Sequence, residues 1–199
     1  MPVPKSILFQ RLKTETQTQH DALESASHAG SIMAHTLTLD QYVDLVVKNH
    51  FCYQQLEPQL EALFPQESGH PLAAFASRRA DDLAEDLNLL SVPSRQFAWT
   101  YLPPELDLAS LIGALYVLEG SRLGGKVIVR ALQKNLHLAS ISRFHFFEQT
   151  GIETGPRWLA FQQAANHCLA DSTAISRAVE SAKRMFQSFQ MVYEEEPIR

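Results

Sequence analysis

The segment LYVLEGSRLGGKVI, residues 115–128, carries three glycines, Gly120, Gly124 and Gly125, within six residues. The rest of the segment is typical of a long buried helix. A glycine inside a helix costs roughly 1 kcal/mol relative to alanine, so three of them so close together need a reason. The segment therefore predicts a central helix that lacks side-chain bulk at one place.

The glycines also share one side of the predicted helix. At about 100° per residue, Gly113, Gly120 and Gly124 fall within a narrow arc. Val117 and Val127 lie beside them, which leaves a stripe almost without bulk against which a broad, flat group can lie. Taken alone, such a stripe more often indicates two helices in close contact through small residues.

The composition fits one globular domain spanning residues 1–199, with residues 1–6 expected to be flexible. The chain is 45% hydrophobic and 20% charged, with a net charge of −5. A chain of this length buries most of the surface that its unfolded form exposes. The negative net charge, without a basic block, argues against a nucleic-acid or anionic-membrane partner.

The two cysteines, Cys52 and Cys168, lie in helical patterns without a CxxC or paired-loop context. We interpret them as small core residues of a protein in a reducing compartment. The N-terminus has no apolar signal region, and no uninterrupted apolar stretch reaches the ~18 residues of a membrane span. The expected location is therefore cytoplasmic, without a membrane span.

Helical periodicity without a strand pattern predicts an all-α, single-domain bundle of several helices. The predicted helices cover residues 7–27, 38–63 with a break or bend at Pro58, a third ending near 90, then 107–133, 156–168 and a last one from about 173. Thr38 and Gln41 form a capping-box signature before the second. Prolines indicate an irregular connection over 91–105, and residues 140–154 have the weakest pattern, with room for a short helix.

A histidine on the first predicted helix has neighbours suited to metal binding. His20 is followed at i+4 by Glu24, which can accept the hydrogen bond that orients an imidazole ring. Lys13, seven residues before His20, is expected on the same face about 10 Å along the helix. A lone helical histidine is usually an ordinary surface or core residue, but these neighbours favour an iron ligand with a cation for a peripheral carboxylate.

The His20 segment and the Glu-Gly-Ser-x-Leu-Gly-Gly segment at residues 119–125 together resemble the two hallmark stretches of biliverdin-producing heme oxygenases. The similarity covers most of the chain, includes the WLAF segment at 158–161, and is closest to the bacterial branch associated with phytochromes. It implies a heme oxygenase-like bundle in which His20 is the proximal iron ligand. It also implies a kinked, glycine-rich distal helix over the open face of the iron.

The implied activity is cleavage of heme by O2 and reducing equivalents to biliverdin, carbon monoxide and iron, with heme as both substrate and cofactor. Without a strand followed by GxGxxG, the chain has no predicted flavin or nicotinamide site, so a separate ferredoxin or reductase is the expected electron donor. A bilin-accepting phytochrome is a further candidate partner. By this resemblance, the catalytic residues are Gly120, Ser121 and Gly124, and the heme-binding residues are Lys13, Glu24, Val117, Gly125 and Arg130.

Two departures from the animal and cyanobacterial pattern affect the predicted site. Ser121 aligns with an aspartate that organises distal water, but serine also occurs there in the bacterial branch, so we expect a different water network and retained activity. Leu159 and Gln163 align with basic residues that contact the heme propionates. Lys13 keeps one expected propionate contact. The candidates for the other are Arg122, Lys126 and Arg130.

Two other functions stay open from the sequence. One is a heme-binding carrier or sensor that keeps His20 without turning heme over, and the other is a helical scaffold whose glycine stripe only packs. Glu67 and His70 have the Glu-x-x-His spacing of di-iron proteins, but they lie in a Pro/Gly loop without a second copy. His50 is interpreted as a buried histidine with satisfied hydrogen bonds.

Overall fold

The fold is all-α, as the periodicity predicts. The structure is a computed structural model that describes residues 6–64, 69–76, 78–150 and 153–197, and these ranges contain no strand. Most of the segment expected to be flexible, residues 1–5, and Glu67 lie outside them. The helices are α1 (Ile7–Glu15), α2 (Gln17–Ala26), α3 (Ala29–Met33), α4 (Leu39–Glu61), η1 (Pro71–Phe75), α5 (Ala80–Leu90), α6 (Leu108–Leu123), α7 (Gly125–Lys134), η2 (Leu136–Leu138), α8 (His145–Thr150), α9 (Thr154–Cys168) and α10 (Ser172–Glu194).

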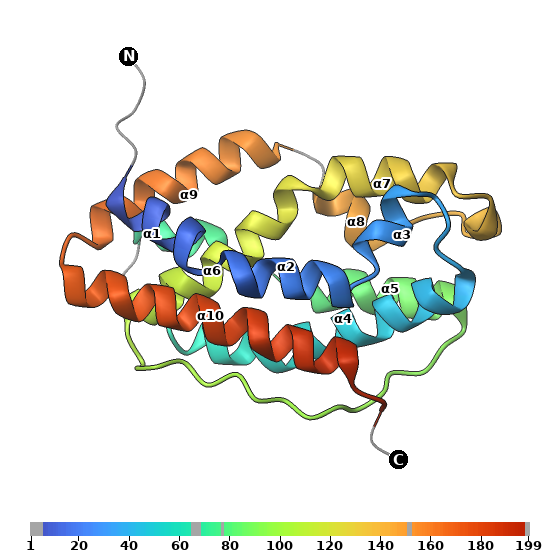
Figure 1. Ribbon diagram of the computed structural model, residues 1–199, viewed down its shortest axis with the longest axis horizontal. Helices are drawn as coiled ribbons and strands as arrows, with labels where there is room; N and C mark the ends of the chain where they lie inside the picture. Colours follow the sequence, from blue (N-terminus) through green and yellow to red (C-terminus); the bar gives the residue numbers. More distant parts are fainter. Residues whose placement is uncertain (1–5, 65–68, 77, 151–152, 198–199) are drawn as a thin grey trace.

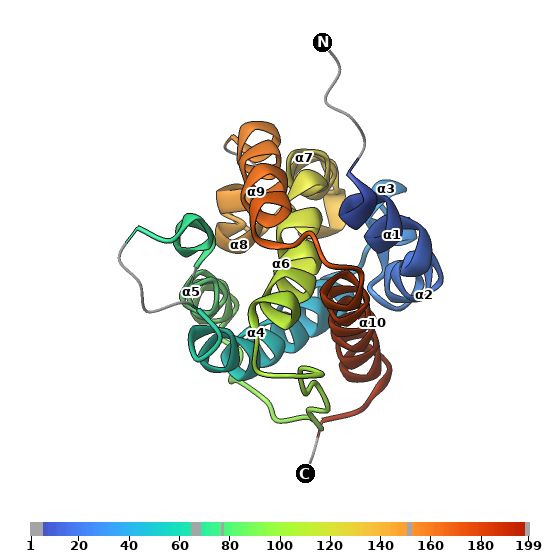
Figure 2. The ribbon, with the colours of Figure 1, turned by 90° about the vertical axis from the view of Figure 1, so that its left-hand side faces the viewer.

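The helix α6 lies at the centre of the bundle, with α4, α9 and α10 around it (Figure 2). Every residue from Ala109 to Leu115 is buried, which is typical of a helix covered on all sides. The Asp107 carboxylate begins the helix by accepting from the Ser110 N–H at 2.8 Å. The sequence of α6 therefore fits the centre of the core.

Close contact between α6 and α10 accounts for the first glycine of the stripe. A Cβ atom on Gly113 would lie 2.0 Å from the carbonyl oxygen of Ala178 and 2.8 Å from the Cβ of Ser181. Only glycine permits this approach. The expectation of one stripe facing a flat group is therefore wrong at Gly113, where the helix-packing alternative holds.

The glycine-rich segment forms two helices instead of one helix over 107–133. The first, α6, ends at Leu123, and α7 begins at Gly125. The Gly124 carbonyl accepts from the N–H groups of Val127 and Ile128, both at 3.0 Å, so α7 starts directly from the bend. Figure 1 shows α6 and α7 meeting at an angle near α2. The kink expected in this segment is confirmed, and its glycines are a usual cause of one.

The predicted helix over residues 7–27 is divided as well. Thr16, between α1 and α2, is 1% exposed, and its hydroxyl donates to the Leu12 carbonyl at 2.7 Å. Such a bond competes with the backbone hydrogen bonds of a helix and bends it. The prediction of a single helix is therefore wrong, and Lys13 and His20 lie on different helices. None of the residues of α2 is buried.

The capping box of α4 is confirmed. The Gln41 N–H donates to the Thr38 hydroxyl at 3.2 Å, and the Thr38 N–H donates to the Gln41 side chain at 2.9 Å. We expect Thr38→Ala to lower the free energy of unfolding by about 1 kcal/mol, because the first turn of α4 loses a hydrogen-bond acceptor. Urea unfolding followed by circular dichroism measures this change. An unchanged midpoint would show that the capping box adds nothing to stability.

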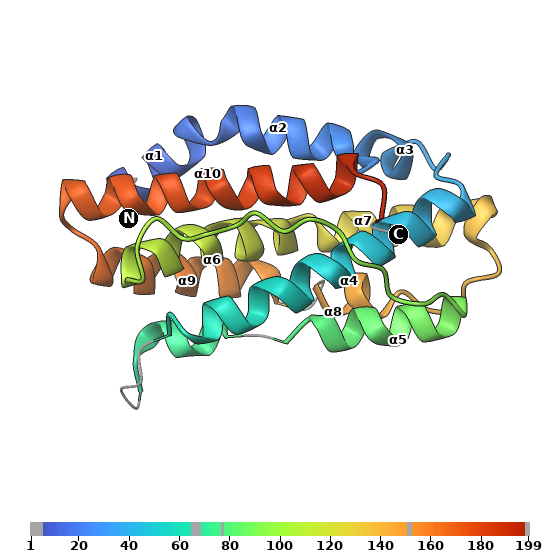
Figure 3. The same cartoon turned by 90° about the horizontal axis from the view of Figure 1, so that it is seen from below.

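The remaining connections surround this core. The irregular segment expected over 91–105 crosses the outer face of the bundle (Figure 3), where Trp99 contacts Phe51 of α4 and Phe189 of α10. The short helix expected within 140–154 is α8. The helix α4 continues through Pro58 to Glu61. Within the described ranges, every helix is too short or too polar to cross a membrane.

Candidate functional site

A cavity of about 1040 Å³ lies between α2 and the bend that joins α6 to α7. Its walls are mostly aromatic and aliphatic side chains, which come from both ends of the chain. The aromatic ones, apart from His20, are Phe9, Tyr53, Tyr116, Phe146, Phe147, Trp158, Phe186, Phe189 and Tyr193. A cavity of this size and character suits a cofactor-sized ligand.

This cavity brings together most of the predicted site residues. Its lining includes Lys13, His20, Glu24, Val117, Gly120, Ser121, Gly124 and Gly125. Arg130 lines a separate hollow of about 230 Å³ with Lys126 and Glu148. The structure therefore does not place Arg130 where the predicted heme-binding role requires it.

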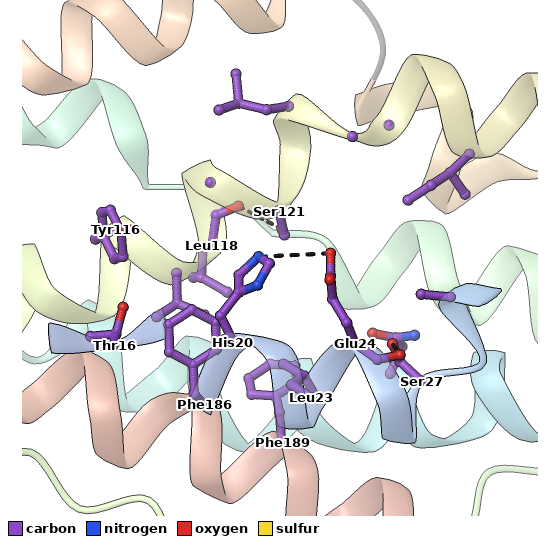
Figure 4. Close-up of a pocket in the computed structure, with 18 of the residues that line it drawn as sticks. Thr16, His20, Leu23, Glu24, Ser27, Tyr116, Leu118, Ser121, Phe186 and Phe189 are labelled. Carbon is purple, nitrogen blue, oxygen red and sulfur yellow. Dashed lines mark hydrogen bonds and ion pairs between the residues drawn. The ribbon is translucent and has the colours of Figure 1, made fainter. Parts of the chain in front are cut away.

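His20 projects from α2 toward the wall that carries Leu118 and Ser121 (Figure 4). Its side chain is 47% exposed, so the ring is accessible from the cavity. Phe186 of α10 contacts this ring edge to face, with the ring centroids 5.8 Å apart. An accessible imidazole beside apolar walls is a suitable ligand for the iron of a heme.

Two carboxylates lie beside the His20 ring. The distance from His20 Nε2 to Glu24 Oε1 is 3.9 Å, and that from Nδ1 to Asp21 Oδ1 is 3.4 Å. Glu24 is thus within ion-pair range but beyond hydrogen-bond range, while Asp21, which the sequence analysis missed, is closer. Neighbours at i+1 on a helix are not expected to face each other, so the spacing carried no signal for Asp21. A carboxylate at a ring nitrogen restricts how the ring turns.

The opposite wall is formed by the second half of the glycine stripe. A Cβ atom on Gly120 would have Trp158 as its nearest neighbour, at 4.0 Å. One on Gly124 would be 3.6 Å from Ile128 and 3.8 Å from the Ser121 carbonyl oxygen. Unlike Gly113, these two glycines keep space free in the cavity and do not serve a tight helix contact. A flat ligand can lie directly against the backbone there.

Tyr53 of α4 lines the cavity near this wall and was not predicted as a site residue. Burial raises the pKa of its phenol, while Arg79, Arg122 and a hydrogen bond with Ser121 act in the opposite direction. The phenol therefore stays protonated at neutral pH and can donate a hydrogen bond. In the sequence, Tyr53 has the pattern of any core aromatic residue of a helix.

The cavity has few cationic groups. Among the described residues, Lys13 is the one lysine or arginine on its wall. On α9, Gln162 lines the cavity, whereas Leu159 and Gln163 do not. Arg122 lies 3.4 Å from the buried carboxylate of Glu119. A ligand with two carboxylates would therefore meet one ammonium group and, for its second carboxylate, only neutral donors such as the amides of Gln17, Asn49 and Gln162.

Two other histidines, His50 and His70, were predicted to have no role in this site. His50 is 5% exposed, and its Nδ1 has no hydrogen-bond partner among the described residues. Burial lowers the pKa of His50. The prediction of a buried histidine is confirmed, but that of satisfied hydrogen bonds is wrong. His70 accepts from the Leu72 N–H at 3.2 Å at the start of η1.

The chain is similar in sequence and in fold to known proteins. A Xanthomonas campestris pv. campestris protein named heme oxygenase is 36% identical over 112 residues, which are 56% of this chain and 65% of that relative. The aligned part is thus less than two thirds of the relative's length. Among solved structures, the heme oxygenase of Leptospira interrogans has a TM-score of 0.72 at 17% identity, over 96% of this chain and 100% of that one.

Two further solved structures share the fold. The NO- and CO-bound heme oxygenase of Neisseria meningitidis has a TM-score of 0.68 at 21% identity, over 94% of this chain and 90% of that one. Heme oxygenase-1 of the cyanobacterium Synechocystis, in complex with heme, has a TM-score of 0.69 at 16% identity, over 95% of this chain and 91% of that one. The sequence profile of heme oxygenase matches residues 6–195, and the chain therefore belongs to the heme oxygenase family.

Proposed function

We propose that this protein is a heme oxygenase that opens heme to biliverdin, carbon monoxide and iron, using O2 and external electrons. The observation that carries the proposal is that His20 and a wall of glycines face each other across one apolar cavity (Figure 4). Bound heme supplies both the iron that activates O2 and the ring that is opened. A flat, mostly apolar disc fits between an imidazole on one side and bare backbone on the other.

On the α2 side, His20 is the residue that binds the iron. When Nε2 binds the iron, Asp21, 3.4 Å from Nδ1, is the carboxylate that can restrain the ring. Lys13, on α1, is the ammonium group available to a heme propionate. Because α1 and α2 are separate helices, the iron ligand and the propionate contact are held by different elements.

On the opposite side, the residues of α6 and α7 contribute by leaving space for the ligand. Gly120, Gly124 and Gly125 present backbone without side chains, and Val117 adds an apolar surface that excludes water. Because this wall is bare backbone, its position would decide which part of the ring edge a small molecule could reach. Ser121 and Tyr53 are two of the cavity's hydroxyl groups that could order water there.

Ser121→Ala is expected to slow heme cleavage by less than about tenfold. The Ser121 hydroxyl donates its proton to the Leu118 carbonyl at 2.8 Å, so toward the cavity it can only accept. Backbone carbonyls and bound water can share that role. Single-turnover kinetics with ascorbate measure the effect. A loss above about a hundredfold with normal heme binding would contradict this expectation.

The proposal extends to partners and location. We propose a separate ferredoxin or reductase as the electron donor and a phytochrome as one acceptor of the bilin product. We also propose a cytoplasmic location, a reducing compartment in which thiols such as Cys52 and Cys168 stay free.

The test is an absorbance titration with hemin, followed by ascorbate in air with catalase present. The proposal expects a histidine-ligated Soret band that decays into biliverdin absorbance. A band that stays stable, even with a ferredoxin system, would instead identify a non-catalytic heme carrier or sensor. No band at all would refute heme binding and leave only the fold.

A further inference from the structure

We propose that Glu119 and Arg157 are positioning residues that fix the bend between α6 and α7 above the cavity. The inference rests on the proposed function, because the height of the bend matters to the reaction only when heme lies beneath it. Of residues 116–121, Glu119 alone does not line the cavity. It is nevertheless 2% exposed, so its carboxylate is buried on another side of α6.

This carboxylate is bound by two arginines. Arg157 of α9 donates from Nε to Glu119 Oε2 at 2.7 Å and from Nη2 to Oε1 at 2.8 Å. Such paired bonds fix the relative orientation of the two groups, as a single hydrogen bond does not. Arg122, in the last turn of α6, has its Nε 3.4 Å from Glu119 Oε1. One carboxylate thus joins α9 to the end of α6.

Arg157 is itself held from a third element. Its Nη1 donates to the Ala74 carbonyl of η1 at 3.2 Å, and its guanidinium lies 5.1 Å from the centre of the Phe75 ring. The contacts therefore run from η1 through α9 to α6. The next residue on α9, Trp158, is the nearest neighbour of the open space at Gly120. The ion pair and the cavity wall are thus adjacent on both helices.

The bend needs such an anchor because its own backbone is weakly restrained. Gly120, Gly124 and Gly125 allow more backbone conformations than other residues, and no side chain caps the start of α7 at Gly124. A buried carboxylate held by two guanidinium groups loses much of its stabilisation when one of them moves away. The Glu119–Arg157 ion pair therefore holds the bend at one height above the cavity. That height in turn would determine which part of a bound ring is open to attack.

The experiment compares Glu119→Gln and Arg157→Lys with a control, Arg177→Gln. Arg177 forms an ion pair at the other end of α6, where its Nε lies 2.8 Å from Asp107 Oδ2. Two readouts are taken: hydrogen exchange of the amides of residues 118–128 in the heme-free protein, and the ratio of biliverdin isomers formed. We expect Glu119→Gln to speed exchange in this segment by about tenfold and to change the isomer ratio.

Arg157→Lys keeps the charge but loses the paired bonds, so it should have a smaller effect on both readouts. It also carries the test if Glu119→Gln does not fold. The control should lower the melting temperature while leaving both readouts unchanged. The proposal is overturned if the folded variants lose stability but keep parental exchange and isomer ratio. If the parent protein leaves heme intact, the proposed function fails, and parental exchange in the variants would then overturn the anchor separately.

Discussion

Under the proposed function, replacing His20 with alanine is expected to reduce heme cleavage by at least about a hundredfold, because the iron would lose its protein ligand. Among the described residues, His20 is the one histidine that lines the cavity. No neighbouring imidazole is therefore in place to substitute for it. The ferric heme complex should lose its histidine-ligated Soret band, and added imidazole should restore part of both the band and the turnover.

The matched control is His167→Ala. His167 is also an exposed helical histidine, but it lies on α9 and does not line the cavity. This variant should bind and cleave heme as the parent does. The assignment of His20 fails if His20→Ala degrades heme at the parental rate without added imidazole.

A leucine at Gly120 is expected to block heme binding while leaving the protein folded. A side chain there enters open space, since its Cβ atom would have no neighbour nearer than 4.0 Å. Leucine also forms helix better than glycine by up to about 0.8–1 kcal/mol, so the melting temperature of the heme-free protein should stay level or rise. Hemin titration should show affinity reduced by at least about tenfold, because the side chain would occupy the space that the proposed function assigns to the heme ring.

Gly113→Ala is the matched control on the same helix. Its added Cβ would lie 2.0 Å from the Ala178 carbonyl oxygen, so α6 and α10 must separate. We expect a loss of about 1–3 kcal/mol in the free energy of unfolding. Protein that still folds should lose less heme affinity than Gly120→Leu, because the added methyl group lies outside the cavity. If Gly120→Leu bound and cleaved heme normally, the distal wall would have to lie elsewhere.

Features of the fold that depend only on residues close together in the sequence could be predicted. Three such features are the capping pair Thr38 and Gln41, the proline-rich connection over 91–105 and the apolar periodicity of α6. Each depends on nearby residues, so the sequence alone predicts it. The break at Thr16 was not predicted, because a threonine in an otherwise helical pattern shows no sign that its hydroxyl will bind Leu12. The two glycines Gly113 and Gly120 share one helix face, and only the packing of α10 against the first tells them apart.

The site residues also divide into those that the sequence predicts and those that only the packing of the helices brings together. His20, Glu24 and the residues of the bend were predicted because they lie in two short segments that resemble a family. Arg130 was predicted as a heme contact from its charge, but the direction of α7 after the bend turns it to a different hollow. Tyr53 of α4 and Gln162 of α9 line the cavity because of how the bundle packs, and no local sequence pattern marks them.

The helix that carries His20 contributes little to the core, since α2 buries none of its residues fully and only Leu23 and Ala26 pack against the core from one side. Local opening of such a helix costs little free energy. A ligand that binds only the closed form adds stability to it in proportion to the logarithm of its concentration. Under the proposed function, heme would thus add stability to the helix that binds it. Each turnover would destroy the molecule that supplied this stability, so α2 would open more easily as the products leave.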